Sequence, residues 1–215
     1  MKPTGAKLSW TAADTLRIIA LQGKSLGGNM RSAWFAVSIG AVLATANAQA
    51  AALSQNAQIR VALSAAPPAI AAHAGVVAHD MKGATILLRK GSNGWTCMPP
   101  SSGAGADPEP RPACFDANGL AFMTAFGAGH APDPDKPGYS YMLQGGSGWS
   151  NTDPAATKLP PGRKDYIHIP PHFMVLSAKM ANESGLPLHE SDPDTHRPFV
   201  MFGGTPFALM IVPVK

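Results

Sequence analysis

The chain has few charged side chains. They make up 14% of its 215 residues, against about 25% in a typical soluble domain. The net charge is +4, and all of this excess lies in the first 50 residues, where five basic side chains accompany a single acidic one. From Ala51 onward the charges balance, and no basic stripe is interleaved with aromatic residues. The distribution gives no support for a nucleic-acid partner, so none is predicted.

The common signatures of cofactor and nucleophile chemistry are also missing. The sequence contains no phosphate-binding loop, dinucleotide fingerprint or calcium-binding EF-hand loop, and its two cysteines do not form a C-x-x-C pair. The serines of the turn 145–150 lack the G-x-S-x-G spacing of a nucleophile elbow. No cofactor is predicted, apart from a divalent metal considered below.

An export signal is present near the N-terminus. From Met30 the chain reads MRSAWFAVSIGAVLATANAQA, with Arg31 before an apolar run over 33–44 and an A-x-A cleavage site at 48–50. This order is that of a secretory signal peptide, and the run is too short to cross a bilayer as a helix. We predict a leader over 1–50 whose true start is Met30, and a single mature domain over 51–215. Cleavage near Ala50 would leave a periplasmic or secreted protein without a stable membrane anchor.

The two cysteines, Cys97 and Cys114, both lie after the predicted cleavage site. Cysteines in an oxidising compartment are expected to pair. The segment between them is rich in Pro, Gly and Ser, and no third or fourth ligand stands at zinc spacing. We therefore predict a structural disulfide.

Proline and glycine divide the chain into short elements. They supply 43 of the 215 residues, which leaves room only for short helices and strands. Strand-like and helix-like segments do not alternate as in βαβ units, so the predicted class is α+β, with a mainly antiparallel sheet of short strands and two or three short helices. Asp153 followed by Pro154 predicts one further helix start. The other predicted helices span 56–65 and 116–126, and the predicted strands span 76–79, 85–89, 95–98, 139–144, 173–176, 199–202 and 207–212.

Several unusual strings occur together in the mature part: NGWTCMP (93–99), YMLQGG (141–146), SNTDP (150–154), PPHFMV (170–175) and PFVMFGGTPFALMIVPV (198–214). In these strings the chain resembles an uncharacterised family of exported bacterial proteins. The resemblance extends from about Leu63 to the C-terminus and implies one intact domain. It transfers no activity and no catalytic residue.

A small-ligand site is predicted where the glycine-rich turn 145–150 meets the segment 166–172. Small-molecule sites combine an apolar wall with a few converging polar groups, and histidine is the side chain that changes charge most easily near neutral pH. The alternative is two neighbouring loops without a ligand. The candidate ligand-binding residues are Ser147, Trp149, Ser150, Tyr166, His168 and His172.

A metal site is the second candidate. The stretch 189–196 carries imidazoles and carboxylates, the ligand types that zinc prefers. The alternative is a solvated loop, because Pro187, Pro193 and Pro198 in and around this stretch prevent regular structure. The candidate metal ligands are His189, Asp192, Asp194 and His196.

Two functions remain open from the sequence, and it does not decide whether the protein is an enzyme. The leading hypothesis is a non-catalytic exported domain whose partner is a small molecule or an envelope protein. The alternative is a metal-assisted hydrolase that uses His168, His172, His189 and His196 with nearby carboxylates.

Overall fold

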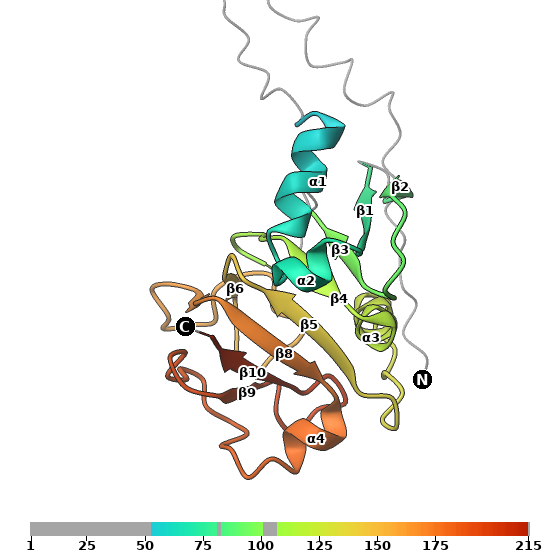
Figure 1. The fold of residues 1–215 in the computed structure, drawn as a ribbon. Coiled ribbons are helices and arrows are strands. Elements are labelled where there is room, and N and C mark those ends of the chain that lie inside the picture. The colour runs from blue at the N-terminus through green and yellow to red at the C-terminus, as the bar shows by residue number, and fades with distance from the viewer. Residues whose placement is uncertain (1–52, 81–82, 101–106, 215) are drawn as a thin grey trace, which may run out of the picture. The chain divides into compact units, whose positions relative to one another are not determined.

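The computed structural model describes residues 53–80, 83–100 and 107–214, all within one compact unit, Ala50–Lys215. The predicted signal peptide and its cleavage site lie outside the described residues. None of the helices in the described ranges is long and apolar enough to cross a membrane. The elements shown in Figure 1 are α1 (Gln55–Leu63), α2 (Pro68–Ala71), β1 (Gly75–His79), β2 (Thr85–Arg89), β3 (Thr96–Met98), β4 (Ala113–Phe115), α3 (Ala117–Gly127), β5 (Gly138–Met142), β6 (Gly146–Gly148), β7 (Ile167–Ile169), β8 (His172–Leu176), α4 (Ala178–Asn182), β9 (Phe199–Met201) and β10 (Leu209–Pro213).

The predicted α+β class is confirmed. Eight strands form one sheet in the order β2-β1-β3-β4-β5-β8-β10-β9, and β6 and β7 form a separate two-stranded ribbon. Every pair in the large sheet is antiparallel except β1 with β3. The predicted hairpin over 76–89 is the antiparallel pair β1–β2. The C-terminal strand β10 lies inside the sheet, between β8 and β9, as its apolar sequence requires.

Helix α3 begins where the sequence predicts, at the N-cap Asp116. The Asp116 carboxylate accepts hydrogen bonds from the backbone N–H of Gly119 at 2.7 Å and of Tyr139 at 2.9 Å. One side chain therefore caps the helix and ties it to β5. The contact is close because two glycines meet there: a Cβ on Gly138 would lie 2.2 Å from the backbone nitrogen of Gly119. No larger residue fits at Gly138 while α3 stays on the sheet.

The two faces of the sheet carry different cores. On one face, α1 packs on Val76, Cys97 and Cys114, and α4 packs near β9 and β10. On the other face, Phe122 of α3 and the isoleucines of β7 pack against the side chains of β4, β8, β9 and β10. Side chains alternate between the faces of a strand, which is why neighbours such as Cys114 and Phe115 belong to different cores.

The predicted helix start at Asp153 is wrong, because the chain forms only a turn there. The hydroxyl of Ser150 accepts from the N–H groups of Thr152 and Asp153, and the Asp153 carboxylate accepts from Ala155 N–H. These side chains satisfy amides that a helix would leave unpaired. Pro160 follows six residues after Pro154 and disfavours the helical conformation at the residue before it. Strands β4, β6 and β7 and helices α2 and α4 were not predicted.

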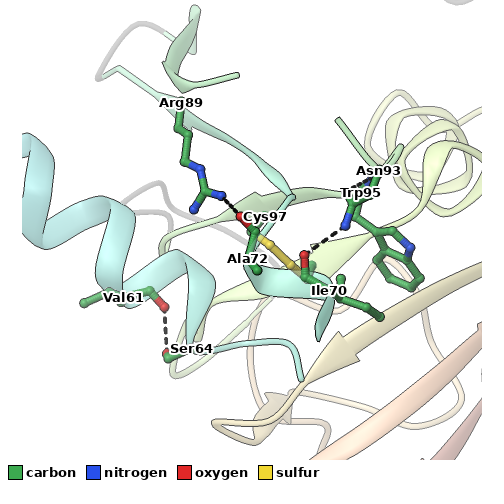
Figure 2. The surroundings of a disulfide bond; sticks show 9 residues. Val61, Ser64, Ile70, Ala72, Arg89, Asn93, Trp95 and Cys97 are labelled. Carbon is green, nitrogen blue, oxygen red and sulfur yellow. Dashed lines mark hydrogen bonds between the residues drawn. A yellow bond between two sulfur atoms is a disulfide. The ribbon is translucent and has the colours of Figure 1, made fainter. Parts of the chain in front are cut away.

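Cys97 and Cys114 lie directly opposite each other on β3 and β4, at disulfide distance and with Cα atoms 3.9 Å apart. Both are fully buried. Figure 2 shows the hydrogen bonds around the pair, where Asn93 Nδ2 donates to the Ile70 carbonyl at 2.9 Å and the Arg89 guanidinium donates to the Ala72 carbonyl. The pairing predicted from the sequence is therefore the one that the sheet builds.

The disulfide should stabilise the fold mainly by restricting the unfolded chain. Closing a loop of this length is worth about 3 kcal/mol in the chain-entropy estimate. Urea unfolding of the oxidised protein should show a free energy of unfolding higher by about that amount than unfolding with a thiol reductant. The variant Cys97→Ala/Cys114→Ala serves as the control, since its stability should not respond to reductant. Equal stability of the wild type with and without reductant would contradict the bond.

Candidate functional site

A cavity of about 180 Å³ lies on the α3 side of the sheet. Its floor comes from the strands, and α3 contributes Met123 and Phe126 to its wall. The floor is apolar because β4, β5, β8, β9 and β10 each direct apolar side chains to this face. The main apolar residues of the floor are Phe115, Met142, Met174, Met201, Leu209 and Ile211.

The β6–β7 ribbon forms another wall, and its glycines explain how closely it approaches the floor. A Cβ on Gly146 would lie 3.0 Å from Cε1 of His172 and 3.4 Å from the methyl group of Met142. A Cβ on Gly148 would lie 3.2 Å from the methyl group of Met201. The glycine-rich turn is therefore needed for close approach to the cavity-lining side chains.

His172 supplies the most deeply buried polar group of the cavity. It is fully buried, and its Nδ1 lies 2.7 Å from the Pro170 carbonyl oxygen. A carbonyl can only accept, so Nδ1 carries the proton and donates. Desolvation lowers the pKa of the imidazole, and the hydrogen bond to Pro170 opposes this only partly. The neutral ring thus keeps a lone pair on Nε2, which has no hydrogen-bond partner.

Trp149 supplies a second unsatisfied group. Its indole Nε1 is buried and has no hydrogen-bond partner, and the residue lines the cavity. The indole meets the ring of Tyr166 edge-on, with centroids 6.3 Å apart, which fixes its orientation. Buried donors and acceptors are normally paired, so the unpaired atoms of Trp149 and His172 make this cavity the candidate ligand site.

The two predicted serines line the cavity, but their hydroxyls are already engaged. Ser147 Oγ donates to the Glu109 carbonyl and accepts from Glu109 N–H, both at 3.0 Å. Ser150 Oγ accepts from two backbone N–H groups of the turn that follows it. These serines hold the wall in place rather than offering a free nucleophile.

Charged residues lie at the side where the cavity opens. Asp107, Arg111 and Asp153 line it and are exposed. Although Asp107 is exposed as a residue, desolvation of its carboxyl raises its pKa to about 6. The Arg111 guanidinium is paired with Glu109 at 2.8 Å. The opening is therefore polar, whereas the interior is apolar.

The two segments of the predicted ligand site do lie side by side, since β6 pairs with β7 and Ser147 stands opposite His168. The ribbon separates their side chains, however. His172 and Trp149 line the cavity, whereas His168 is exposed and pairs with Asp165 at 3.1 Å. His168 borders a second, polar groove of about 300 Å³ together with His196. The Tyr166 hydroxyl donates to the Glu109 carboxylate at 3.3 Å.

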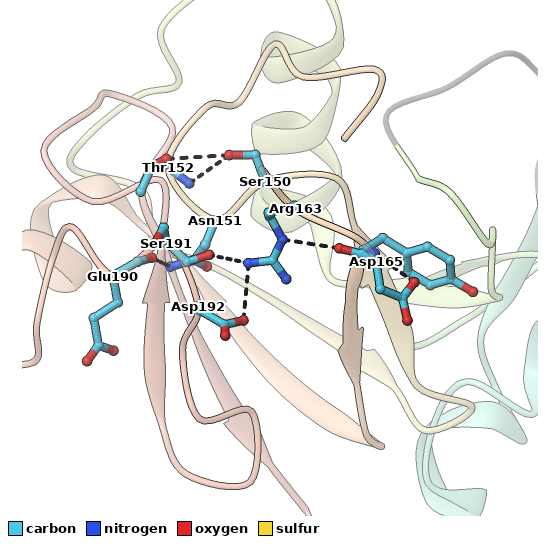
Figure 3. Close-up of polar contacts among 9 residues, drawn as sticks. Ser150, Asn151, Thr152, Arg163, Asp165, Glu190, Ser191 and Asp192 are labelled. Atoms are coloured by element: carbon cyan, nitrogen blue, oxygen red, sulfur yellow. Dashed lines mark hydrogen bonds and ion pairs between the residues drawn. The ribbon is translucent and has the colours of Figure 1, made fainter. Parts of the chain in front are cut away.

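The predicted metal ligands do not line the cavity. Asp192 pairs with Arg163 at 3.1 Å, and Asp194 pairs with Arg197 at 2.8 Å. Figure 3 shows Arg163 also donating to the Ser191 and Asp165 carbonyls. Within the described ranges, no three His, Cys, Asp or Glu side chains are grouped so as to hold a metal ion. The metal site and the hydrolase alternative stay predictions.

Two residues of the site region were missed by the sequence analysis. Asn151 is fully buried and donates to the carbonyls of Glu190 and Val200 at 2.8 and 2.9 Å. Figure 3 shows Asn151 beside Glu190. Phe202, a cavity-lining residue, has a φ of 58°. Its N–H donates to the Asn151 carbonyl at 2.7 Å. A phenylalanine in this conformation is strained, and such strain is frequent at ligand sites.

Comparisons with protein-family models, with curated proteins and with solved structures find no match for this chain. The resemblance to exported bacterial proteins stays a proposal.

The buried imidazole should make stability depend on pH. Its pKa is lowered in the folded protein, so below pH ~6.5 the unfolded chain binds more protons and stability falls with falling pH. His172→Phe keeps a ring but cannot titrate, and should lack this part of the loss. Urea unfolding of both proteins at pH values between 7.5 and 5 measures the difference.

Comparing the two proteins also removes the contribution of Asp107. Its raised pKa acts in the opposite direction, since protonation near pH 6 favours the folded state, but the residue is present in both. Parallel pH profiles for wild type and His172→Phe would contradict the assignment of a neutral, buried His172.

Proposed function

We propose that this protein is an exported, non-catalytic binding domain that takes up a small, largely apolar molecule in the cavity beneath α3 and the β6–β7 ribbon. The observation that carries the proposal is an apolar cavity of about 180 Å³ lined by two residues with unpaired buried polar atoms, His172 Nε2 and Trp149 Nε1. Apolar walls with a few placed polar groups are the usual composition of small-molecule sites.

The size of the cavity limits the ligand. An engineered apolar cavity of about 150 Å³ is large enough to bind benzene. The present cavity of about 180 Å³ is slightly larger. It therefore suits a molecule of about one six-membered ring with a small substituent.

Binding is favoured over catalysis by the state of the hydroxyl groups. Ser147 and Ser150 are the serines that line the cavity, and both hydroxyls are committed to backbone groups. Among the described residues, His172 bonds only to the Pro170 carbonyl, and no hydroxyl or carboxylate is hydrogen-bonded to it. The arrangement lacks the nucleophile–base pair that covalent catalysis needs.

An exported location accords with the disulfide-distance pair Cys97–Cys114, because disulfides persist in oxidising compartments. We propose a periplasmic or secreted protein on this basis and on the signal-peptide pattern over 30–50. In such a compartment a small-ligand binder would meet its ligand directly.

Filling the cavity should abolish binding. Ala113 is a half-buried, cavity-lining residue on β4, and Ala113→Leu would place a larger apolar side chain inside. Toluene should raise the melting temperature of the wild type and produce no shift with Ala113→Leu. Ala155→Leu is the matched control, because Ala155 is exposed, and it should respond as the wild type does.

The result can be read only from folded variants, so circular dichroism of each is recorded first; overpacking costs typically 1–3 kcal/mol. A toluene response that survives in Ala113→Leu would place binding elsewhere. A wild type that responds to no small apolar molecule would contradict the proposed function.

A further inference from the structure

We propose that the ligand is a neutral ring-sized molecule carrying a hydroxyl group, of the phenol class, whose hydroxyl hydrogen is donated to Nε2 of His172. This inference rests on the proposed function and specifies its ligand.

The protonation state of His172 decides what the ligand must offer to its Nε2 atom. Its Nδ1–H is fixed by the Pro170 carbonyl at 2.7 Å, so the neutral ring can only accept at Nε2. Nε2 belongs to a fully buried residue that lines the cavity, and it has no hydrogen-bond partner among the described residues. A donor carried by the ligand would supply that partner.

The indole N–H of Trp149 can only donate a hydrogen bond. Its unpaired Nε1–H calls for an acceptor on the ligand. A hydroxyl is the smallest group that both donates and accepts. The ligand hydroxyl can donate its hydrogen to Nε2 of His172. The hydroxyl oxygen, or the face of the ligand's ring, can accept the N–H of Trp149.

The interior of the cavity disfavours charged ligands. The interior floor consists of apolar side chains from five strands, and burying an unpaired charge there is costly. A carboxylate would also place an acceptor against the lone pair of His172. The neutral, hydroxyl-bearing class remains.

The methionines of the floor favour an aromatic ring. Met142, Met174 and Met201 all line the cavity, and thioether sulfur makes favourable contacts with aromatic rings while adapting to their shape. Met142 and His172 both face Gly146, where an added Cβ would lie 3.4 Å from the Met142 methyl group and 3.7 Å from His172 Nε2. Because Nε2 is buried, the proposal requires a neighbouring side chain to move aside, and the unbranched Met142 is the flexible candidate.

Three probes of similar shape test the hydroxyl. Phenol donates and accepts, anisole only accepts, and toluene does neither. Their affinities for wild type and His172→Phe are measured by isothermal titration calorimetry, and the phenol-to-toluene affinity ratio is compared between the two proteins so that the hydration of each probe cancels. Loss of one hydrogen bond with a donor left buried should lower this ratio about tenfold. The anisole-to-toluene ratio should stay unchanged.

A second measurement needs no variant. In wild-type protein labelled with ¹⁵N, phenol should move the ¹⁵N resonance of His172 Nε2 in the direction of a hydrogen-bonded lone pair, whereas toluene should not. This readout keeps the proposal testable if His172→Phe fails to fold.

The outcomes separate the two proposals. Toluene binding with an unchanged phenol-to-toluene ratio, or with no selective movement of the Nε2 resonance, would overturn the hydroxyl inference and leave the proposed function standing. Binding of none of the three probes would overturn both.

Discussion

The carboxylate of Asp116 holds together the two layers between which the cavity lies. It accepts from Gly119 N–H inside α3 and from Tyr139 N–H on β5, so one side chain both starts the helix and fixes its distance from the sheet. The glycines at 119 and 138 make that distance short. With α3 held at β5, its later residues Met123 and Phe126 reach over the strands as a wall of the cavity, and the remaining space is left for the β6–β7 ribbon to close.

Features with a local cause could be predicted from the sequence. The N-cap at Asp116, the β1–β2 hairpin and the Cys97–Cys114 pair each follow from residues close in the chain or from the small number of cysteines. Strands β6 and β7 could not be predicted. Gly146–Gly148 has no β propensity of its own, and it becomes a strand because its missing side chains let it lie against His172 and Met201 while pairing with β7.

In the candidate site, too, some features could be predicted from residue type, whereas others depend on the tertiary structure. Trp149 and His172 were singled out by residue type, and both line the cavity. The sequence did not show that Ser147 and Ser150 would be occupied by backbone groups, since their partners depend on how the loops fold. The methionine floor collects residues from three strands, and only the sheet order brings them together. The conformation of Phe202 has no local signal beyond the glycines that follow it.

The cavity also has an energetic cost that the fold must offset. An empty apolar space forfeits dispersion contacts along its walls, and unpaired polar atoms on His172 and Trp149 each cost free energy when buried. The positive φ of Phe202 adds strain at the same place. These three penalties fall on one region of a domain whose other core holds a buried cross-strand cysteine pair and tightly packed alanines. A ligand that fills the space and satisfies the two nitrogens would remove two of the three penalties, and this recovery supplies free energy for its binding.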